Sequence, residues 1–400
     1  MILHDGIPAR RGGERKRHTG RVNPYNRLHV TGLYWAGLSR RRRVNHRIGR
    51  RGDDPVFRVA TVVILAAALV AAAQSTPPRL ATSRVFAAQI AALSEPSGYF
   101  DTDNLISNER SYLQVLPELE RRGVRGGAYI GVGPDQNFSY IAAIRPSVAF
   151  IIDIRRDNLL LQLLFKALFE QAHTRIEYLA LLFGRPVPDD MNSWRESSVA
   201  RVAQYLNRPA LDTKSISALR ARIDTVIRGF GVPLSAEDVA TIDRFHRRFI
   251  ERGLSLQFQS TGRPPQGYYP TYGDLLLETD GEGRQGNYLV SEGSFQFVKS
   301  LQERDGVIPV VGNLSGTSAL AGIGRLLREK GESLSAFYAS NVEFYLERDG
   351  SYQRFIGNLA RIPRTSRAVI IRSIFGRGIG GSLSVAQPVD ELLSQFATGR

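Results

Sequence analysis

The 400-residue chain contains no cysteine. This absence excludes disulfide bonds, thiolate metal sites and a cysteine nucleophile, and it leaves the redox compartment unconstrained. Only six histidines occur, and the two that follow the N-terminal region, His173 and His246, have no His or Cys partner at metal-ligand spacing. We therefore predict no metal site and interpret both residues as ordinary helix-face histidines.

Two enzyme motifs are also missing. No G-x-S-x-G elbow of a serine hydrolase occurs, and the stretch 312–317 lacks its spacing. No G-x-x-x-x-G-K-[ST] loop occurs either, which disfavours a P-loop NTPase. These absences do not exclude chemistry that depends on binding and alignment of the reactants more than on an activated nucleophile.

Acidic residues are scarce at one end of the chain. Residues 1–51 hold fourteen Lys and Arg against two acids, so the remaining 349 residues carry only +3 of the net charge of +15. The argument for nucleic-acid binding applies to this tail alone, and we expect no specific nucleic-acid partner. Gly, Pro and Arg clusters without an apolar period predict that residues 1–55 are a basic tail without a fixed fold.

An uncharged apolar segment, residues 59–73, follows the tail. Its basic flank, short length and alanine-rich end predict that residues 56–78 are a secretory signal peptide or a short membrane anchor, which would place the body outside the cytoplasm. Two other interpretations stay open. A buried alanine-rich helix would leave the protein in the cytoplasm, and a true start downstream of the written one would remove the tail.

The body, residues 80–400, alternates apolar runs with helical patterns. Strands that are apolar on both faces belong to a sheet covered by helices on both sides. We therefore predict a doubly wound, mostly parallel, Rossmann-like α/β fold with a helical insertion at about 185–255, where prolines interrupt the pattern. Residues 158–183 predict one long helix, and Ser107 is expected to cap a helix running to about Arg122. The predicted strands are residues 128–130, 148–153, 307–311, 334–338 and 368–374.

A glycine turn follows the first predicted strand. Gly131 and Gly133 let the backbone approach a ligand, and the next helix presents free N–H groups. Asp153 ends the second strand, where an acid can hold a ribose diol. Gln136 stands where a dinucleotide fingerprint needs a third glycine, which favours a cofactor without bridging phosphates. Because ligands of open sheets bind beyond the carboxyl ends of strands, the candidate cofactor-binding residues are Gly131, Gly133, Asp135, Gln136, Asn137, Asp153 and Asn313.

These residues also have structural interpretations. Glycines in a βα turn serve tight packing as well, and Asp153 is equally suited to capping a helix or pairing with Arg155.

Two further groups are candidates for lining the same cleft. Asn104 and Glu109 lie in a polar stretch ahead of the first strand, with turn and cap chemistry as the alternative. Tyr268 and Tyr272 lie in a Pro- and Gly-rich stretch and could cover a substrate, with local packing as the alternative.

Three motifs, residues 131–142, 145–156 and 335–343, resemble those of a poorly characterised bacterial family described as methyltransferase-like. The resemblance runs from about residue 98 to 361. It implies a class I methyltransferase fold that binds S-adenosylmethionine, with the glycine turn around the amino-acid part and Asp153 on the ribose. Members of that family tend to carry Asp where this chain has Asn313.

The expected function is therefore that of an S-adenosylmethionine-binding, methyltransferase-like protein with an unidentified acceptor. The sequence does not identify which residues are catalytic. The alternative is an exported or membrane-anchored binding or scaffold protein that keeps the fold without catalysis. Export favours this alternative, because S-adenosylmethionine is made in the cytoplasm.

Overall fold

The computed structural model describes residues 79–102, 104–260, 266–376 and 381–397. They form an α/β fold around a six-stranded sheet of order β3-β2-β1-β4-β5-β6. The first five strands run parallel, and β6 is antiparallel to β5. The predicted mostly parallel, Rossmann-like α/β fold is thus confirmed. The strands are β1 (Ala128–Val132), β2 (Val148–Asp153), β3 (Val307–Val311), β4 (Leu334–Ser340), β5 (Arg364–Gly376) and β6 (Gly381–Pro388).

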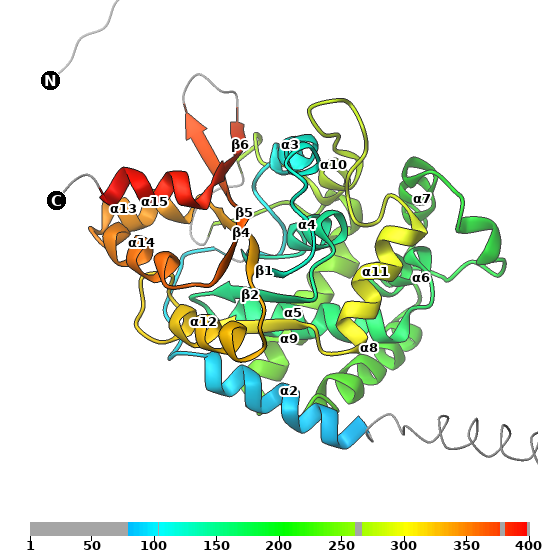
Figure 1. Ribbon diagram of the computed structural model, residues 1–400. Coiled ribbons are helices and arrows are strands. Elements are labelled where there is room, and N and C mark those ends of the chain that lie inside the picture. The colour runs from blue at the N-terminus through cyan, green and yellow to red at the C-terminus, as the bar shows by residue number, and fades with distance from the viewer. Residues whose placement is uncertain (1–78, 103, 261–265, 377–380, 398–400) are drawn as a thin grey trace, which may run out of the picture. The chain divides into compact units, whose positions relative to one another are not determined.

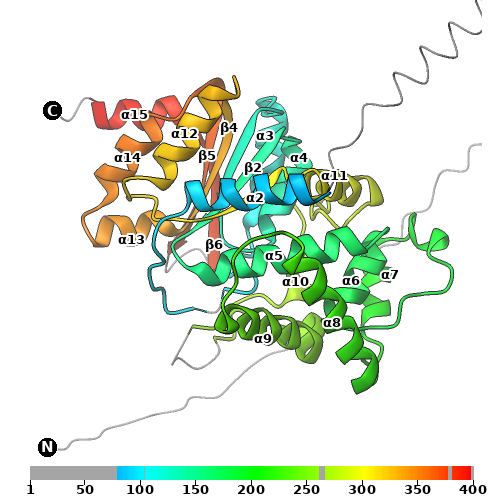
Figure 2. The ribbon, with the colours of Figure 1, turned by 90° about the horizontal axis from the view of Figure 1, so that it is seen from below.

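Helices cover both faces of the sheet (Figure 1), which is why every residue of β1, β3 and β4 is buried. Figure 2 shows the two layers on opposite sides of the strands. One layer contains α4 (Gln136–Ile144), α5 (Arg156–Gln171) and α11 (Glu292–Glu303). The other contains α12 (Ala319–Glu329), α13 (Val342–Arg348), α14 (Tyr352–Ala360) and α15 (Val389–Ala397).

Of the remaining helices, α2 (Arg79–Leu93) packs against β3 and α12, α3 (Leu116–Arg121) packs against α4, and the others extend the α5 side. Residues 185–255, the predicted insertion, contain three α-helices, of which α8 and α9 pack against α5. The bounds of these other helices are α6 (Arg175–Phe183), α7 (Val199–Leu206), α8 (Thr213–Arg228), α9 (Ala236–Arg252) and α10 (Tyr272–Leu277).

The single helix predicted over residues 158–183 is wrong. The chain leaves the helical conformation at Ala172, and Thr174 starts a second helix by accepting a hydrogen bond from the backbone N–H of Glu177. The apolar stripe continues across the break because both helices bury it against the same core. Periodicity alone therefore did not reveal the bend.

The helix predicted to run from Ser107 to Arg122 is also wrong. The Ser107 hydroxyl accepts from the backbone N–H of Glu109, only two residues on, which makes a local turn rather than a helix cap. Regular α-helix begins at Leu116, after one 3₁₀ turn.

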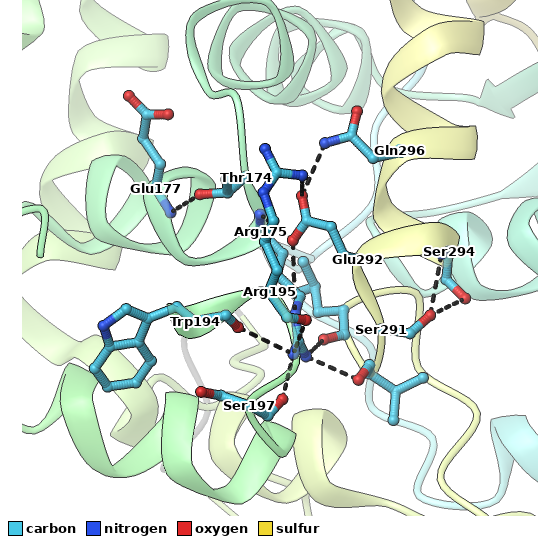
Figure 3. Close-up of polar contacts among 12 residues, drawn as sticks. Thr174, Arg175, Glu177, Trp194, Arg195, Ser197, Ser291, Glu292, Ser294 and Gln296 are labelled. Carbon is cyan, nitrogen blue, oxygen red and sulfur yellow. Dashed lines mark hydrogen bonds and ion pairs between the residues drawn. The ribbon is translucent and has the colours of Figure 1, made fainter. Parts of the chain in front are cut away.

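Arg175 joins α6 to two irregular segments inside the protein (Figure 3). Its side chain is 1% exposed, and its Nη1 donates to the carbonyl oxygens of Leu289 and Val290, each at 2.8 Å. Its Nη2 donates to the carbonyl oxygen of Ser197. The planar guanidinium thus satisfies carbonyl groups from two segments that would otherwise be buried without partners.

Within the described ranges, no helix has both the length and the apolar character that crossing a bilayer requires. The predicted basic tail, residues 1–55, and the predicted signal peptide or anchor, residues 56–78, lie outside those ranges.

Candidate functional site

The strand order reverses between β1 and β4. From β1 the chain continues to β2 and β3 on one side, and it returns to β4 and β5 on the other. Ligands of open α/β sheets bind at the carboxyl ends of the strands at such a reversal. Gly133 follows β1 at this point, and Ser340 ends β4. The carboxyl ends of these two strands define the candidate site.

Gly131 allows a close approach within the protein itself. The amide oxygen of Asn137 accepts from the Tyr129 hydroxyl at 2.8 Å, and its amide nitrogen donates to the carbonyl oxygens of Val132 and Pro134 at 2.9 and 2.8 Å. A Cβ atom on Gly131 would collide with the Asn137 amide oxygen. Asn137 therefore holds the turn, and the missing side chain at Gly131 makes room for it.

Gly133 brings two other predicted residues together. Its φ of +86° favours glycine, and an added Cβ would lie 3.2 Å from the amide nitrogen of Gln136 and 3.6 Å from that of Asn104. Asn104 itself has φ of +45°, an uncommon conformation outside glycine. Asn104, Gly133 and Gln136 thus meet at the carboxyl end of β1.

Several buried polar atoms on the segments around this turn have no hydrogen-bond partner. Gln162 donates to the carbonyl oxygen of Gly133 at 3.2 Å, but its Oε1 accepts nothing. Asn158, one turn earlier on α5, is 2% exposed, and neither atom of its amide has a partner. The Oε1 atom of Gln136 and the Oγ1 atom of Thr102 are also unpaired. Because an unpaired buried group costs about 1–3 kcal/mol, these atoms call for water or for the polar groups of a ligand.

Asp153 is bound by Arg155. The guanidinium Nε and Nη2 donate to the two carboxylate oxygens at 3.1 and 3.0 Å, and the backbone N–H of Arg155 donates at 2.9 Å. Arg155 also donates to the carbonyl oxygen of Thr102 at 2.8 Å. These contacts agree with the interpretation of Asp153 as an ion-paired acid. A ribose bound at this position would therefore share the carboxylate with Arg155.

Asp135 lies on the other side of the turn, among tyrosines. Its carboxylate accepts from the hydroxyls of Tyr272 and Tyr288 at 3.1 and 3.3 Å. Burial raises the pKa of Asp135 to about 6, although both hydrogen bonds oppose this change. Tyr272 is thus buried against Asp135, whereas Tyr268 is 59% exposed and contacts the ring of Tyr269. The two candidate cleft tyrosines lie in different surroundings.

Glu109 is completely buried at the carboxyl ends of β4 and β5. Its carboxylate accepts from the hydroxyls of Tyr338, at 2.7 Å, and of Ser340 and Ser373. Burial raises the pKa of Glu109, and the three hydroxyl donors act in the opposite direction. Gln136 donates to the Tyr338 hydroxyl at 3.4 Å, which links Glu109 to the glycine turn.

Asn313 lies at the end of β3 and stabilises its own turn. Its Oδ1 accepts from the backbone N–H and the hydroxyl of Ser315 at 2.9 and 3.0 Å. The neighbouring helix start, α12, is bound by Glu95, which accepts from the backbone N–H groups of Asn313, Ser318 and Ala319. A carboxylate of the protein therefore occupies the anion-binding position at this helix start.

Among the described residues, metal ligation does not mark the candidate site. In the part of the chain that the structure describes, no group of three or more His, Cys, Asp and Glu residues is arranged to hold a metal ion. His246 is buried and bonds the carbonyl oxygen of Leu181 at 3.1 Å, and burial lowers its pKa to about 4. Cavities of about 420 and 470 Å³ lie elsewhere, beside α3 and α4 and between α8 and α9.

Sequence reasoning missed Asn158, Gln162, Tyr338 and Ser340. A signal for the first two was present, since Asn158, Gln162 and Lys166 repeat every four residues within an otherwise apolar stretch. Polar residues at this spacing share one helix face, and inside a buried helix they need partners.

No curated protein matches the chain in sequence. A family model described as a domain of unknown function, DUF7790, matches residues 104–203 and 269–395. The matched ranges contain the glycine turn, Glu109, the unpaired amides on α5 and all six strands. Because they make up more than half of the sequence, the chain belongs to the DUF7790 family.

Proposed function

We propose that this protein binds S-adenosylmethionine at the carboxyl ends of β1 and β4 and transfers its methyl group to an acceptor. The reversal of strand order, the glycine turn and the resemblance of the surrounding motifs support this proposal. When bound, the cofactor supplies an electrophilic methyl group. The protein's part is to bind and align the reactants, which requires no nucleophilic side chain.

The observation that carries the proposal is the set of unpaired amides at the glycine turn and on the first two turns of α5. Gln136, Asn158 and Gln162 together offer unpaired donors and acceptors, and none of them is charged. Arg155, a buried cation at the carboxyl end of β2, already binds Asp153. Three of the four unpaired amide atoms are acceptor oxygens, and Asn158 Nδ2 is the fourth. Such a site fits the adenine, ribose and amino-acid groups of an adenosyl cofactor better than bridging phosphates, which need several cationic or N–H donors.

Calorimetric titration of the full chain with S-adenosylmethionine tests the proposal, with a dinucleotide as the comparison ligand. Asn158→Leu is the informative variant, because it keeps the size of the side chain and removes an unpaired buried amide. It should raise the free energy of unfolding and abolish binding. Asn207→Leu, at an exposed position after α7, is the matched control and should bind as the wild type does. No heat and no thermal stabilisation with S-adenosylmethionine would contradict the proposal.

A second candidate is a binding or scaffold protein without catalysis, exported or anchored through residues 59–73. The engagement of Asp153 by Arg155 favours it, because the residue proposed for the ribose already has a protein partner. Fractionation of cells that express the tagged full chain tests the location. Recovery of the whole protein in the cytoplasmic fraction would contradict export, and binding of S-adenosylmethionine would contradict a role without the cofactor.

A further inference from the structure

Glu109 is a buried carboxylate whose partners are all neutral hydroxyls. Tyr338, Ser340 and Ser373 donate to it, and no cationic side chain binds it in the ranges that the structure describes. A buried ionised carboxylate usually has a cationic partner or takes up a proton. The surroundings of Glu109 therefore suit a carboxyl group that alternates between its ionised and its protonated form.

A chain of serine hydroxyls leads from Glu109 toward the surface. The Ser373 hydroxyl lies 3.4 Å from that of Ser384, and the Ser384 hydroxyl lies 3.2 Å from that of Ser111. Ser111 in turn lies 2.7 Å from the hydroxyl of Ser382, which is partly exposed on β6. Each hydroxyl can donate one hydrogen bond and accept another, so the chain is continuous in either direction.

We propose that Glu109 is the proton acceptor of the candidate site and that Ser373, Ser384, Ser111 and Ser382 carry its proton to solvent. The assignment of Glu109 to the reaction rests on the proposed function. This assignment of Glu109 also defines the class of methyl acceptor, which must carry a proton on its nucleophilic oxygen or nitrogen.

The proton balance follows from this class of acceptor. As the acceptor forms its bond to the methyl carbon, the electron pair of the broken sulfur–carbon bond stays on sulfur. The acceptor oxygen or nitrogen loses one proton, which an Oε atom of Glu109 takes up. A concerted shift along the hydroxyls then passes one proton from Glu109 to Ser373 and releases another from Ser382 to water. No oxidant or reductant is required.

Other ionisable groups around Glu109 keep their charge state while it changes. Tyr129 on β1, Tyr140 on α4 and Tyr338 on β4 are buried, and burial raises the pKa of each well above the ordinary tyrosine value. Arg372 precedes Ser373 but points to the other face of β5, where its Nε donates to Glu343. Glu109 is therefore the group of this cluster that exchanges protons most readily, and burial raises its pKa above that of an ordinary glutamate.

Infrared spectroscopy of the full chain tests the proton path without any cofactor. A carbonyl band of a protonated carboxyl group, absent in Glu109→Gln, should appear as the pH is lowered. Transfer into heavy water should shift this band rapidly in the wild type and several-fold more slowly in Ser384→Ala and Ser111→Ala. Labelled glutamate assigns the band to a glutamic acid even if Glu109→Gln does not fold. Ser351→Ala is the control, because Ser351 is buried and its hydroxyl has no protein partner.

The possible outcomes test the serine path, the assignment of Glu109 and the proposed function separately. Exchange that is equally fast in Ser384→Ala, Ser111→Ala and Ser351→Ala overturns the serine path, and the lack of any Glu109-dependent carbonyl band while the protein is folded overturns the assignment of Glu109. Slow exchange in the two path variants supports the path even if S-adenosylmethionine gives no heat, a result that would contradict the proposed function alone.

Discussion

The hydroxyl of Tyr129 donates to the amide oxygen of Asn137 at 2.8 Å, next to the position that a side chain on Gly131 would occupy. This contact joins the middle of β1 to the first turn of α4. It gives Gly131 a role in the protein's own packing, in addition to any role in approaching a ligand.

Gly131→Ala should therefore lower the free energy of unfolding by roughly 1–3 kcal/mol, as overpacking typically does. The added Cβ would collide with the Asn137 amide and lie 2.6 Å from the Tyr129 hydroxyl. Urea unfolding followed by circular dichroism measures the change. Gly357→Ala is the control, because a Cβ there meets nothing within 4 Å and alanine favours the helix by up to about 1 kcal/mol. Equal stability of the two variants would show that the Tyr129–Asn137 contact does not require the glycine.

Asp135 gives a pH dependence of known sign. Burial raises the pKa of its carboxyl group from 3.8 to about 6 in the folded state. Between these two values the folded state binds more protons than the unfolded state, so this group lowers the free energy of unfolding as the pH rises from 3.8 to about 6. A shift of about two pKa units corresponds to about 3 kcal/mol.

Asp135→Asn removes the titration, so the stability of this variant relative to the wild type should increase by about that amount across the window. Unfolding by urea at a series of pH values measures it. Asp189→Asn, at an exposed position, should keep the pH dependence of the wild type. A constant difference between Asp135→Asn and the wild type across the window would contradict the raised pKa.

Much of the fold could be predicted because buried parallel strands are continuous apolar runs. The runs at residues 148–153 and 307–311 are strands with those bounds. Strand β6 was missed although Leu383 and Val385 alternate with serines, the pattern of a half-buried strand. Its position at the edge of the sheet explains the weaker apolar signal.

The candidate site was predictable in part for a similar reason. Asn104, Gly133 and Gln136 lie beside the strand end that the glycine turn marks. Asn158 was not predicted because the apolar residues of α5 dominate the pattern of that helix. The hydroxyls of Ser340 and Ser373 contact Glu109 only in the tertiary structure. Sequence spacing carries no information on contacts between residues more than two hundred positions apart.

Glu95 should stabilise α12 through its contacts with three backbone N–H groups. Although burial raises the pKa of Glu95, the hydrogen bonds from Asn313, Ala319 and Ser318 lower it overall. Glu95→Ala should reduce the free energy of unfolding by about 1–2 kcal/mol at neutral pH, the usual effect of losing a helix cap. Because the folded pKa lies below the unfolded value of 4.5, this contribution should vanish as the pH falls below 4.5. Glu329→Ala, exposed on α12, should change stability little; equal losses in both variants would contradict the capping role.

Arg175 should tolerate no substitution by lysine. The guanidinium donates to the carbonyl oxygens of Leu289, Val290 and Ser197, whereas a lysine ammonium is a compact group that cannot reach both segments at once. Each carbonyl left unpaired in the interior costs about 1–3 kcal/mol, so Arg175→Lys should lower the free energy of unfolding by about 3 kcal/mol or more. Arg252→Lys, exposed at the end of α9, should change it by less than about 0.5 kcal/mol. Similar denaturation midpoints for the two variants would mean that the carbonyl groups around Arg175 find other donors, and that the charge alone joins α6 to its neighbours.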